Sequence, residues 1–325
     1  MSNLPGDTVL DRAIGPLSRR HFLGLSAGAA AAILLAACGA AAGTPTPSEE
    51  AEKQELSMAF VPSRDTTEIQ LSGKNIADFL SKETGYKITS TTATSYAAVT
   101  QSITSKKTDL AWISPLSYAQ ARDQNGCYPI TASVRNGTKG YKAFIVVKSD
   151  SPIQKIEDLK GKKFAFGDPL SASSTLYPKA AMLKAGIKTD ADLTSQNISS
   201  ASSVAIAVYQ GQVDAGAFYD DARKNTEVIG KFPDILEKTR IIWTSELIPA
   251  DPQVVRKDLN KAQVAKLKAA MLKMNTDPQA KQFIKDLFTI DALADASDSD
   301  YDTLRDVVKT VDPSILKPAT PTATP

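Results

Sequence analysis

The sequence predicts an α/β fold in which short apolar strands alternate with amphipathic helices. From Leu56 onward, β-patterned runs such as 56–61 are followed by helical runs such as 69–84, and this alternation continues over most of the chain. A second run of the same alternation begins at Ser151, so we expect two similar halves. The chain has 325 residues, of which 42% are hydrophobic, and this is enough to form one large domain or two lobes.

The N-terminus has the pattern of an export and lipidation signal, which we predict to occupy residues 1–37. Residues 18–23, Ser-Arg-Arg-His-Phe-Leu, resemble a twin-arginine export signal, and residues 35–38, Leu-Ala-Ala-Cys, resemble a lipoprotein signal-peptidase box. The alternative is a single transmembrane anchor, but the apolar run is shorter than the ~20 residues that a span requires. We therefore expect a lipid on Cys38, followed by a flexible tether over residues 38–53.

Charge and composition exclude several classes of function for the mature chain. The formal net charge of +2 argues against a nucleic-acid partner. His21, the one histidine, lies in the predicted signal, which excludes Ser-His-Asp and Cys-His catalysis and every histidine-containing metal site. Cys127 is the only cysteine after Cys38, so no disulfide can form within the mature domain. We expect no catalytic residue, no cofactor and no metal.

In the first half, glycine and proline residues mark where the predicted helices and turns begin and end. Gly85 ends the first helical run, and Pro115 occupies the favourable first turn of another helix. A glycine-containing turn is expected over 135–140. The expected strands are 56–61, 87–91, 109–113, 128–134 and 141–147, with helices at 69–84, at 94–105 and after Pro115.

The second half continues the alternation and then becomes mostly helical. The expected strands are 163–166, 214–218 and 240–243, and the expected helices follow Ser173 and cover 202–210, 259–274, 278–287 and 301–311. Residues 313–325 are rich in Pro, Thr and Ala, which is typical of a disordered tail.

The stretch 166–178, Phe-Gly-Asp-Pro-Leu-Ser-Ala-Ser-Ser-Thr-Leu-Tyr-Pro, ends a strand with a hydroxyl-rich turn that opens a helix. A helix N-terminus carries unpaired N–H groups and the positive end of the helix dipole, so hydroxyls beside it can hold an oxyanion without Lys or Arg. Ordinary N-capping is the alternative, and it needs only one hydroxyl. Pro178 either opens or kinks this helix, so which serine forms the cap stays open.

Two segments, 107–113 and 211–218, begin with the same sequence pattern. In each, an aspartate is followed by small and apolar residues. With these segments the chain resembles the phosphonate-binding protein family, the periplasmic substrate-binding proteins of ABC importers for phosphonate, phosphite and phosphate. The resemblance covers about residues 54–290. The blocks that carry it are Tyr96, 109–118, 151–153, 167–178, 211–214 and 247–252.

The resemblance implies a two-lobed periplasmic binding protein fold of type II-like topology, with two crossover strands at a hinge and the ligand enclosed between the lobes. The crossovers would lie near 141–149 and 243–252. The implied division is lobe 1 over 54–143, lobe 2 over 144–245, and a return to lobe 1 with C-terminal helices over 246–312.

The resemblance also implies the ligand-binding residues. They are Tyr96, Ser114, Ser117, Tyr118, Ser171, Ser173, Ser174, Asp221 and Asp251. The helix starts after Ser95, Ser114 and Ser173 could converge on one cleft and donate to an oxyanion. A carboxylate at Asp251 could accept a hydrogen bond from a protonated P–OH and repel sulfate.

The chain departs from the family pattern at three positions: Ile113 replaces an aromatic cleft residue, Ala172 replaces a hydroxyl of the turn, and Asp221 is one carbon shorter than the glutamate found there. These changes weaken the case for a long aminoalkyl ligand. The implied function is a lipid-anchored, extracytoplasmic binder of phosphite, phosphonate or phosphate that delivers its ligand to an ABC permease and is not an enzyme. The alternatives are a ligand-sensing module, a binder of another oxyanion such as a sulfonate, or a hydrolase or transferase.

Overall fold

The computed structural model describes residues 51–317. The predicted signal peptide, the lipidation site Cys38, most of the predicted tether and the last eight residues of the predicted tail lie outside this range. Within it, no helix combines the length and the apolar character needed to cross a bilayer.

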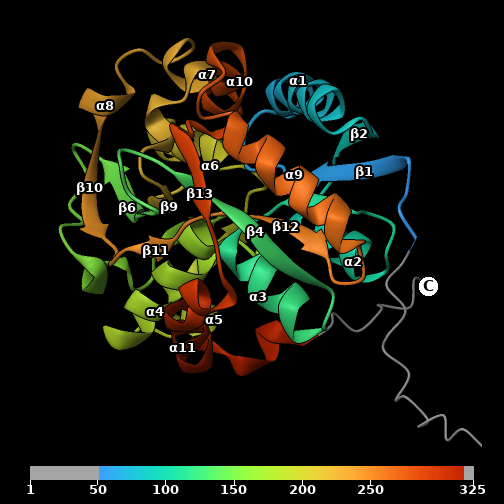
Figure 1. Cartoon of the computed structure of the whole chain (residues 1–325). Coiled ribbons are helices and arrows are strands. Elements are labelled where there is room, and N and C mark those ends of the chain that lie inside the picture. The colour runs from blue at the N-terminus through green and yellow to red at the C-terminus, as the bar shows by residue number, and fades with distance from the viewer. Residues whose placement is uncertain (1–50, 318–325) are drawn as a thin grey trace, which may run out of the picture. The chain divides into compact units, whose positions relative to one another are not determined.

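Lobe 1 is built on a six-stranded sheet with the strand order β13-β4-β12-β3-β1-β2 (Figure 1). Its strands are β1 (Glu55–Phe60), β2 (Lys87–Thr92), β3 (Leu110–Trp112), β4 (Cys127–Val134), β12 (Pro252–Arg256) and β13 (Ala292–Asp295). Its helices are α1 (Thr66–Thr84), α2 (Tyr96–Thr104), α3 (Pro115–Asp123), α9 (Lys261–Lys273) and α10 (Pro278–Phe288).

Lobe 2 is built on a five-stranded sheet with the strand order β10-β6-β9-β7-β8. Its strands are β6 (Ala143–Lys148), β7 (Lys163–Phe166), β8 (Thr194–Asn197), β9 (Ala215–Tyr219) and β10 (Thr239–Thr244). Its α-helices are α4 (Tyr177–Lys184), α5 (Thr189–Asp192), α6 (Ala201–Tyr209), α7 (Thr226–Ile229) and α8 (Ile235–Lys238), and short 3₁₀ turns cover Ile156–Leu159 and Ala222–Lys224.

The two lobes repeat one topology, as the alternation in the sequence predicts. In each sheet three parallel strands lie in the same order, β2-β1-β3 in lobe 1 and β8-β7-β9 in lobe 2. The next strand in each sheet is antiparallel and enters directly after a crossing between the lobes. The two crossings pair with each other as β5 (Gly140–Tyr141) and β11 (Ile248–Pro249), and both lie within or next to the expected crossover segments.

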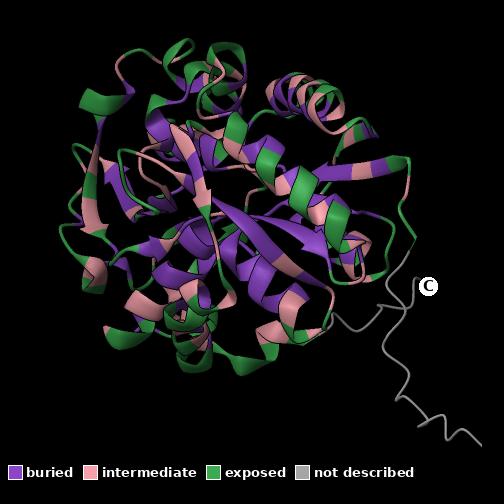
Figure 2. Ribbon diagram, viewed as in Figure 1, coloured by how far each residue is buried: buried purple, intermediate pink, exposed green. Residues whose placement is uncertain are grey.

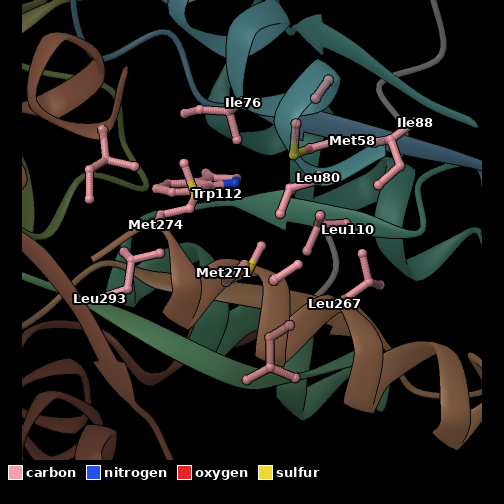
Figure 3. Close-up of a cluster of buried hydrophobic side chains, with 14 of the residues drawn as sticks. Met58, Ile76, Leu80, Ile88, Leu110, Trp112, Leu267, Met271, Met274 and Leu293 are labelled. Atoms are coloured by element: carbon pink, nitrogen blue, oxygen red, sulfur yellow. The ribbon is translucent and has the colours of Figure 1, made fainter. Parts of the chain in front are cut away.

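Apolar side chains cover both faces of the lobe 1 sheet. On one face Trp112, Met271 and Leu80 belong to a cluster formed with α1, α9 and α10 (Figure 3). On the other face a second cluster continues from α2 and α3 into lobe 2, where it includes Leu170 and Leu176. Figure 2 shows that central strands such as β4 and β12 are largely buried, whereas the edge strands β10 and β13 are partly exposed, and that exposed residues lie on the outer sides of the helices. The lobes therefore share one continuous apolar contact.

The C-terminal segment joins the lobes a further time. A 3₁₀ turn (Asp298–Tyr301) leads into α11 (Asp302–Val311), which packs against α3 of lobe 1 and α4 of lobe 2. The expectation of disorder is wrong for Pro313–Leu316, which form a 3₁₀ turn. The Gln120 Nε2 donates to the Ile315 carbonyl at 2.7 Å, and apolar packing of this turn fixes it in place.

The repeated aspartate of the sequence has one structural role in both lobes. Asp109 precedes β3 and its Oδ2 accepts a hydrogen bond from the Ser57 N–H at 2.9 Å, while Asp214 precedes β9 and its Oδ2 accepts from the Lys163 N–H at 2.8 Å. Each carboxylate thus caps the start of the neighbouring parallel strand. Asp109 is also buried and pairs with Arg256 at 2.8 Å, whereas Asp214 is exposed.

Because only Asp109 is buried and paired, replacing each aspartate by alanine should lower the free energy of unfolding by different amounts. Asp109→Ala should lower the free energy of unfolding by ~3 kcal/mol, the low end for breaking a buried ion pair, because Asp258 still faces Arg256. Asp214→Ala, the matched control, should cost about 1 kcal/mol, the value of one exposed hydrogen bond. Chemical denaturation measures both, and equal losses would contradict the assigned roles.

Candidate ligand-binding site

A cavity of about 50 Å³ lies between the two lobes, next to the crossover strands. Its wall is rich in hydroxyl groups and contains one cationic side chain among the residues that the structure describes. The polar lining residues of lobe 1 and the crossover are Ser63, Tyr96, Ser114, Ser133, Arg135, Tyr141, Asp251 and Gln253. Those of lobe 2 are Ser171, Ser173, Ser174, Tyr219 and Asp220.

The turn after β7 supplies the serines of lobe 2. Ser171 is the N-cap, and its side chain accepts from the Ser174 N–H at 3.2 Å, which answers the question that the sequence leaves open. The next residues, Ala172–Leu176, form one turn of π-helix that leads into α4. The first N–H groups of such a segment lack intrahelical acceptors, so this end of the helix places donors and the Ser173 and Ser174 side chains at the cavity.

Gly167 allows this turn to fold back on its strand. Its N–H donates to the Ser174 carbonyl at 3.1 Å, and a Cβ on Gly167 would lie 2.4 Å from the Ser174 Cβ. Only a residue without a side chain fits at that distance. The close approach of the serine turn therefore requires glycine at position 167.

Helix starts of lobe 1 meet this turn across the cavity. The Tyr96 N–H, at the start of α2, donates to Asp168 Oδ2 at 3.1 Å, and Ser114 Oγ, the N-cap of α3, donates to the Leu170 carbonyl at 2.7 Å. The lobes are thus closed on each other. Because these contacts use the Tyr96 N–H and the Ser114 hydroxyl, the expectation that three helix starts all donate to a ligand needs correction.

Arg135 is the cationic residue among the lining residues that the sequence analysis missed. It follows β4 in the turn before β5, and its Nη2 pairs with Asp251 Oδ2 at 2.9 Å while its Nε donates to the Phe288 carbonyl at 3.0 Å. Its guanidinium carbon also lies 5.7 Å from the centre of the Tyr141 ring. The buried Nη1 has no hydrogen-bond partner within residues 51–317. A buried charged donor without a partner is costly, so this nitrogen indicates an anionic ligand.

Burial shifts the titration of the acidic groups in the wall. Removal from water raises the pKa of Asp251, although Arg135 beside it acts in the opposite direction. Burial also raises the pKa of Asp220, against a hydrogen bond from the Lys142 N–H. The pKa values of Tyr96, Tyr141 and Tyr219 are raised by burial as well, so these hydroxyls keep their protons at neutral pH and can donate.

Residues 58–301 match the family described as "ABC transporter, phosphonate, periplasmic substrate-binding protein". This match spans more than half of the chain. The chain belongs to this family.

Individual members of the phosphonate-binding family are related to the chain over most of their length. The phosphonates-binding periplasmic protein of Escherichia coli (strain K12) is 28% identical over 75% of this chain and 73% of its own. The phosphate-import protein PhnD of Mycolicibacterium smegmatis is 26% identical over 89% of this chain and 96% of its own. A protein of Prochlorococcus marinus, solved with methylphosphonate, has a TM-score of 0.71 at 21% identity and covers 80% of this chain and 99% of its own. Membership confirms the predicted family, and the solved relative confirms the two-lobed, type II-like fold.

The structure brings six of the nine expected site residues to the cavity. They are Tyr96, Ser114, Ser171, Ser173, Ser174 and Asp251. The other three, Ser117, Tyr118 and Asp221, lie outside the cavity lining, and each bonds to another side chain.

These three residues serve the surrounding structure. Ser117 is fully buried within α3 and bonds to Ser114, and the Tyr118 hydroxyl donates to Asp298 at 2.5 Å. Asp221 forms two bonds with Arg223, at 2.8 and 2.7 Å, and its neighbour Asp220 lines the cavity in its place. Packing of α3 explains the first two, because this helix is buried from Pro115 to Ala121 and the Tyr118 ring packs against Tyr301, with the ring centres 4.6 Å apart.

The close contact between Gly167 and Ser174 predicts that a second substitution can relieve the loss of stability caused by Gly167→Ala. Gly167→Ala should destabilise the fold by ~1–3 kcal/mol and weaken ligand binding, because the added methyl displaces the serine turn. Ser174→Gly removes the clashing Cβ at a cost of ~1 kcal/mol for glycine in a helix. The double variant should therefore be more stable than the sum of the two single losses, as thermal or chemical denaturation would show. Strict additivity would contradict this packing.

Proposed function

We propose that this family member captures a small phosphorus oxyanion in the cavity between its lobes, outside the cytoplasm, and delivers it to an ABC permease. The ligand contacts would come from the Tyr96 hydroxyl, Ser171, Ser173 and Ser174, with Arg135 and Asp251 on the crossover side. Ser114, whose proton bonds to the Leu170 carbonyl, would accept from a ligand hydroxyl. The observation that carries this proposal is the buried Arg135 Nη1, which lacks a partner in the described chain and belongs to a residue that lines a cavity rich in hydroxyl groups.

The size of the cavity favours the smallest phosphorus ligands. A volume of about 50 Å³ corresponds to roughly three to five water-sized groups at ~10–15 Å³ each. The four substituents of a tetrahedral phosphorus centre fill that space. Phosphite, methylphosphonate and phosphate fit this limit, whereas an aminoethyl chain exceeds it. The names of the relatives, which concern phosphonates and phosphate, agree with this ligand class.

Binding without turnover is part of the proposal. The mature chain contains no histidine to act as a general base. Burial raises the pKa of Cys127 to about 12, so this thiol stays protonated at neutral pH, and Cys127 is not among the lining residues. The hydroxyls of the wall thus have neither a histidine nor a thiolate beside them to activate a nucleophile, and the Asp251 carboxylate pairs with Arg135.

Membrane attachment through a lipid on Cys38 completes the proposal, and it is supported by the signal pattern of residues 1–38. Mass spectrometry of the mature N-terminus in the native host would test it, since an unmodified terminus at another residue excludes the lipid. Delivery to a permease is supported by membership of a transporter family.

Isothermal titration of the mature protein with five anions tests the ligand class. Phosphite, methylphosphonate and phosphate should each bind more tightly than aminoethylphosphonate, because of cavity size. Sulfate should bind about ten- to a hundredfold more weakly than the best ligand, because it has no proton to offer the buried carboxylates. Tightest binding of sulfate or of aminoethylphosphonate would refute the proposal.

Arg135→Gln should weaken binding of the best phosphorus anion about ten- to a hundredfold, the loss of one charge-assisted hydrogen bond of ~1.5–3 kcal/mol. The double variant Arg135→Gln/Asp251→Asn separates two explanations. If Arg135 contacts the ligand, the double variant should bind more weakly than Asp251→Asn alone. If Arg135 only neutralises Asp251, the double variant should bind as tightly as Asp251→Asn alone. Titration calorimetry measures both, and circular dichroism checks that the variants fold.

Asp251→Asn should lower affinity for a ligand that carries P–OH, flatten the pH dependence between about 6 and 9, and narrow the gap to sulfate. As pH rises, the proton between ligand and carboxylate is lost and two negative groups face each other, so wild-type binding weakens. Asp221→Asn is the matched control, because that carboxylate pairs with Arg223 outside the cavity lining. An unchanged pH profile in Asp251→Asn would limit Asp251 to a structural role.

A further inference from the structure

Arg64 is a buried cation of lobe 1 that lies outside the cavity lining. It occupies the loop between β1 and α1, and only 4% of its side chain is exposed. Its Nη1 donates to the carbonyls of Asp286 at 3.1 Å and Leu287 at 3.2 Å, in the last turn of α10. The end of a helix is a favourable place for a positive charge, so these bonds fix the guanidinium on lobe 1.

The other end of this guanidinium reaches lobe 2. Arg64 Nη2 lies 3.2 Å from Glu227 Oε2, on α7, and 3.5 Å from Glu68 Oε2 on its own lobe. The Glu227 side chain is 14% exposed, so the pair between the lobes is shielded from water. The Ala201 N–H donates to the Ser63 carbonyl at 3.3 Å beside this pair, which brings the same loop against the start of α6. Figure 1 shows α7 next to α10, the two helices that Arg64 joins.

A chain of hydrogen bonds continues from this ion pair to the cavity. Ser202 Oγ donates to Glu227 Oε1 at 2.6 Å, and Asn225 Nδ2 donates to Ser202 Oγ at 2.9 Å. The same Asn225 nitrogen donates to the Tyr219 hydroxyl at 2.6 Å, and Tyr219 lines the cavity. Since the Tyr219 oxygen accepts from Asn225, its own proton is available to a ligand.

We propose that the Arg64–Glu227 pair is a latch between the lobes that forms on closure and, through Ser202 and Asn225, positions the Tyr219 hydroxyl toward the bound anion. This inference rests on the proposed capture of an anion between the lobes. Arg64 is a positioning residue, because it acts on the ligand only through this chain.

The latch has a distinct kinetic signature. A contact that exists only in the closed state raises the population of that state without changing the encounter between ligand and open protein. Loss of the contact therefore appears mainly in the rate of ligand release. A residue needed only for folding would instead lower stability and leave the release rate unchanged.

The test uses Glu227→Gln, which keeps the shape of the side chain and removes its charge. With phosphite as the probe, stopped-flow measurement should show release about tenfold faster than in wild type and association within about twofold. The matched control is Glu83→Gln, since Glu83 pairs with Lys273 at 2.7 Å within lobe 1 and is similarly shielded, at 19% exposed. The control should release phosphite at the wild-type rate.

A second variant tests the chain itself. Ser202→Ala breaks the link between Asn225 and Glu227, so it should also speed release, and its effect should be less than additive with Glu227→Gln. X-ray scattering should show that Glu227→Gln needs more phosphite than wild type to reach the compact closed form.

The outcomes separate the latch from the proposed function. Wild-type protein that binds phosphite, together with Glu227→Gln that releases it at the wild-type rate, would overturn the latch and leave the proposed function standing. Wild-type protein that binds none of phosphite, methylphosphonate and phosphate would overturn the proposed function and, with it, the coupling of the latch to a ligand.

Discussion

The Arg135 guanidinium lies between the lobes with one nitrogen on Asp251 and a second nitrogen without a protein partner among residues 51–317. A buried charge needs compensation on every side, because the low-polarity interior provides little of the screening that water gives. Asp251 compensates one side only. The remaining donors of the wall, which include tyrosine hydroxyls that stay protonated, face the same small space. Under the proposed function, an anion bound there would accept hydrogen bonds from the unpaired Arg135 nitrogen and from these hydroxyls.

Strand pairing within the lobe 1 sheet places this pair. Arg135 directly follows β4 and Asp251 directly precedes β12, and in these neighbouring strands Ala132 lies opposite Pro252. The Ser133 N–H also donates to the Asp251 carbonyl at 3.0 Å, so lobe 1 fixes the charged part of the site next to the crossover strands. Under the proposed function, the serine turn of lobe 2 would bring neutral donors to this charge when the lobes close. The Arg64–Glu227 pair is one of several contacts between the lobes.

The two lobes share their strand order and their aspartate caps but differ in the residues that they contribute to the cavity. The same strand order and the same aspartate cap occur in both sheets, so one repeated topology explains most of the fold. The proposed function depends on the lining residues, which differ between the lobes. Lobe 2 carries the serine turn, whereas lobe 1 and the crossover carry the arginine and its carboxylate partner.

Local chemistry in the sequence determined the alternation of strands and helices, because side-chain periodicity and capping act over a few residues. It also determined the serine turn, where strand, glycine, hydroxyls and helix follow one another directly, and the family pattern in ordered blocks. The tertiary structure alone decided which side chains meet. The hydrogen bond from Arg135 to Asp251 joins residues that are 116 positions apart in the sequence. Strand pairing brings them together, and no local sequence pattern shows that pairing. Three expected ligand-binding residues lie in segments that match the family pattern, but their side chains do not line the cavity. They are Ser117, Tyr118 and Asp221, and the packing of the surrounding elements decides the direction of each side chain. Contacts between distant segments depend on how sheets and lobes assemble, and for that reason the charged part of the site could not be predicted from local patterns.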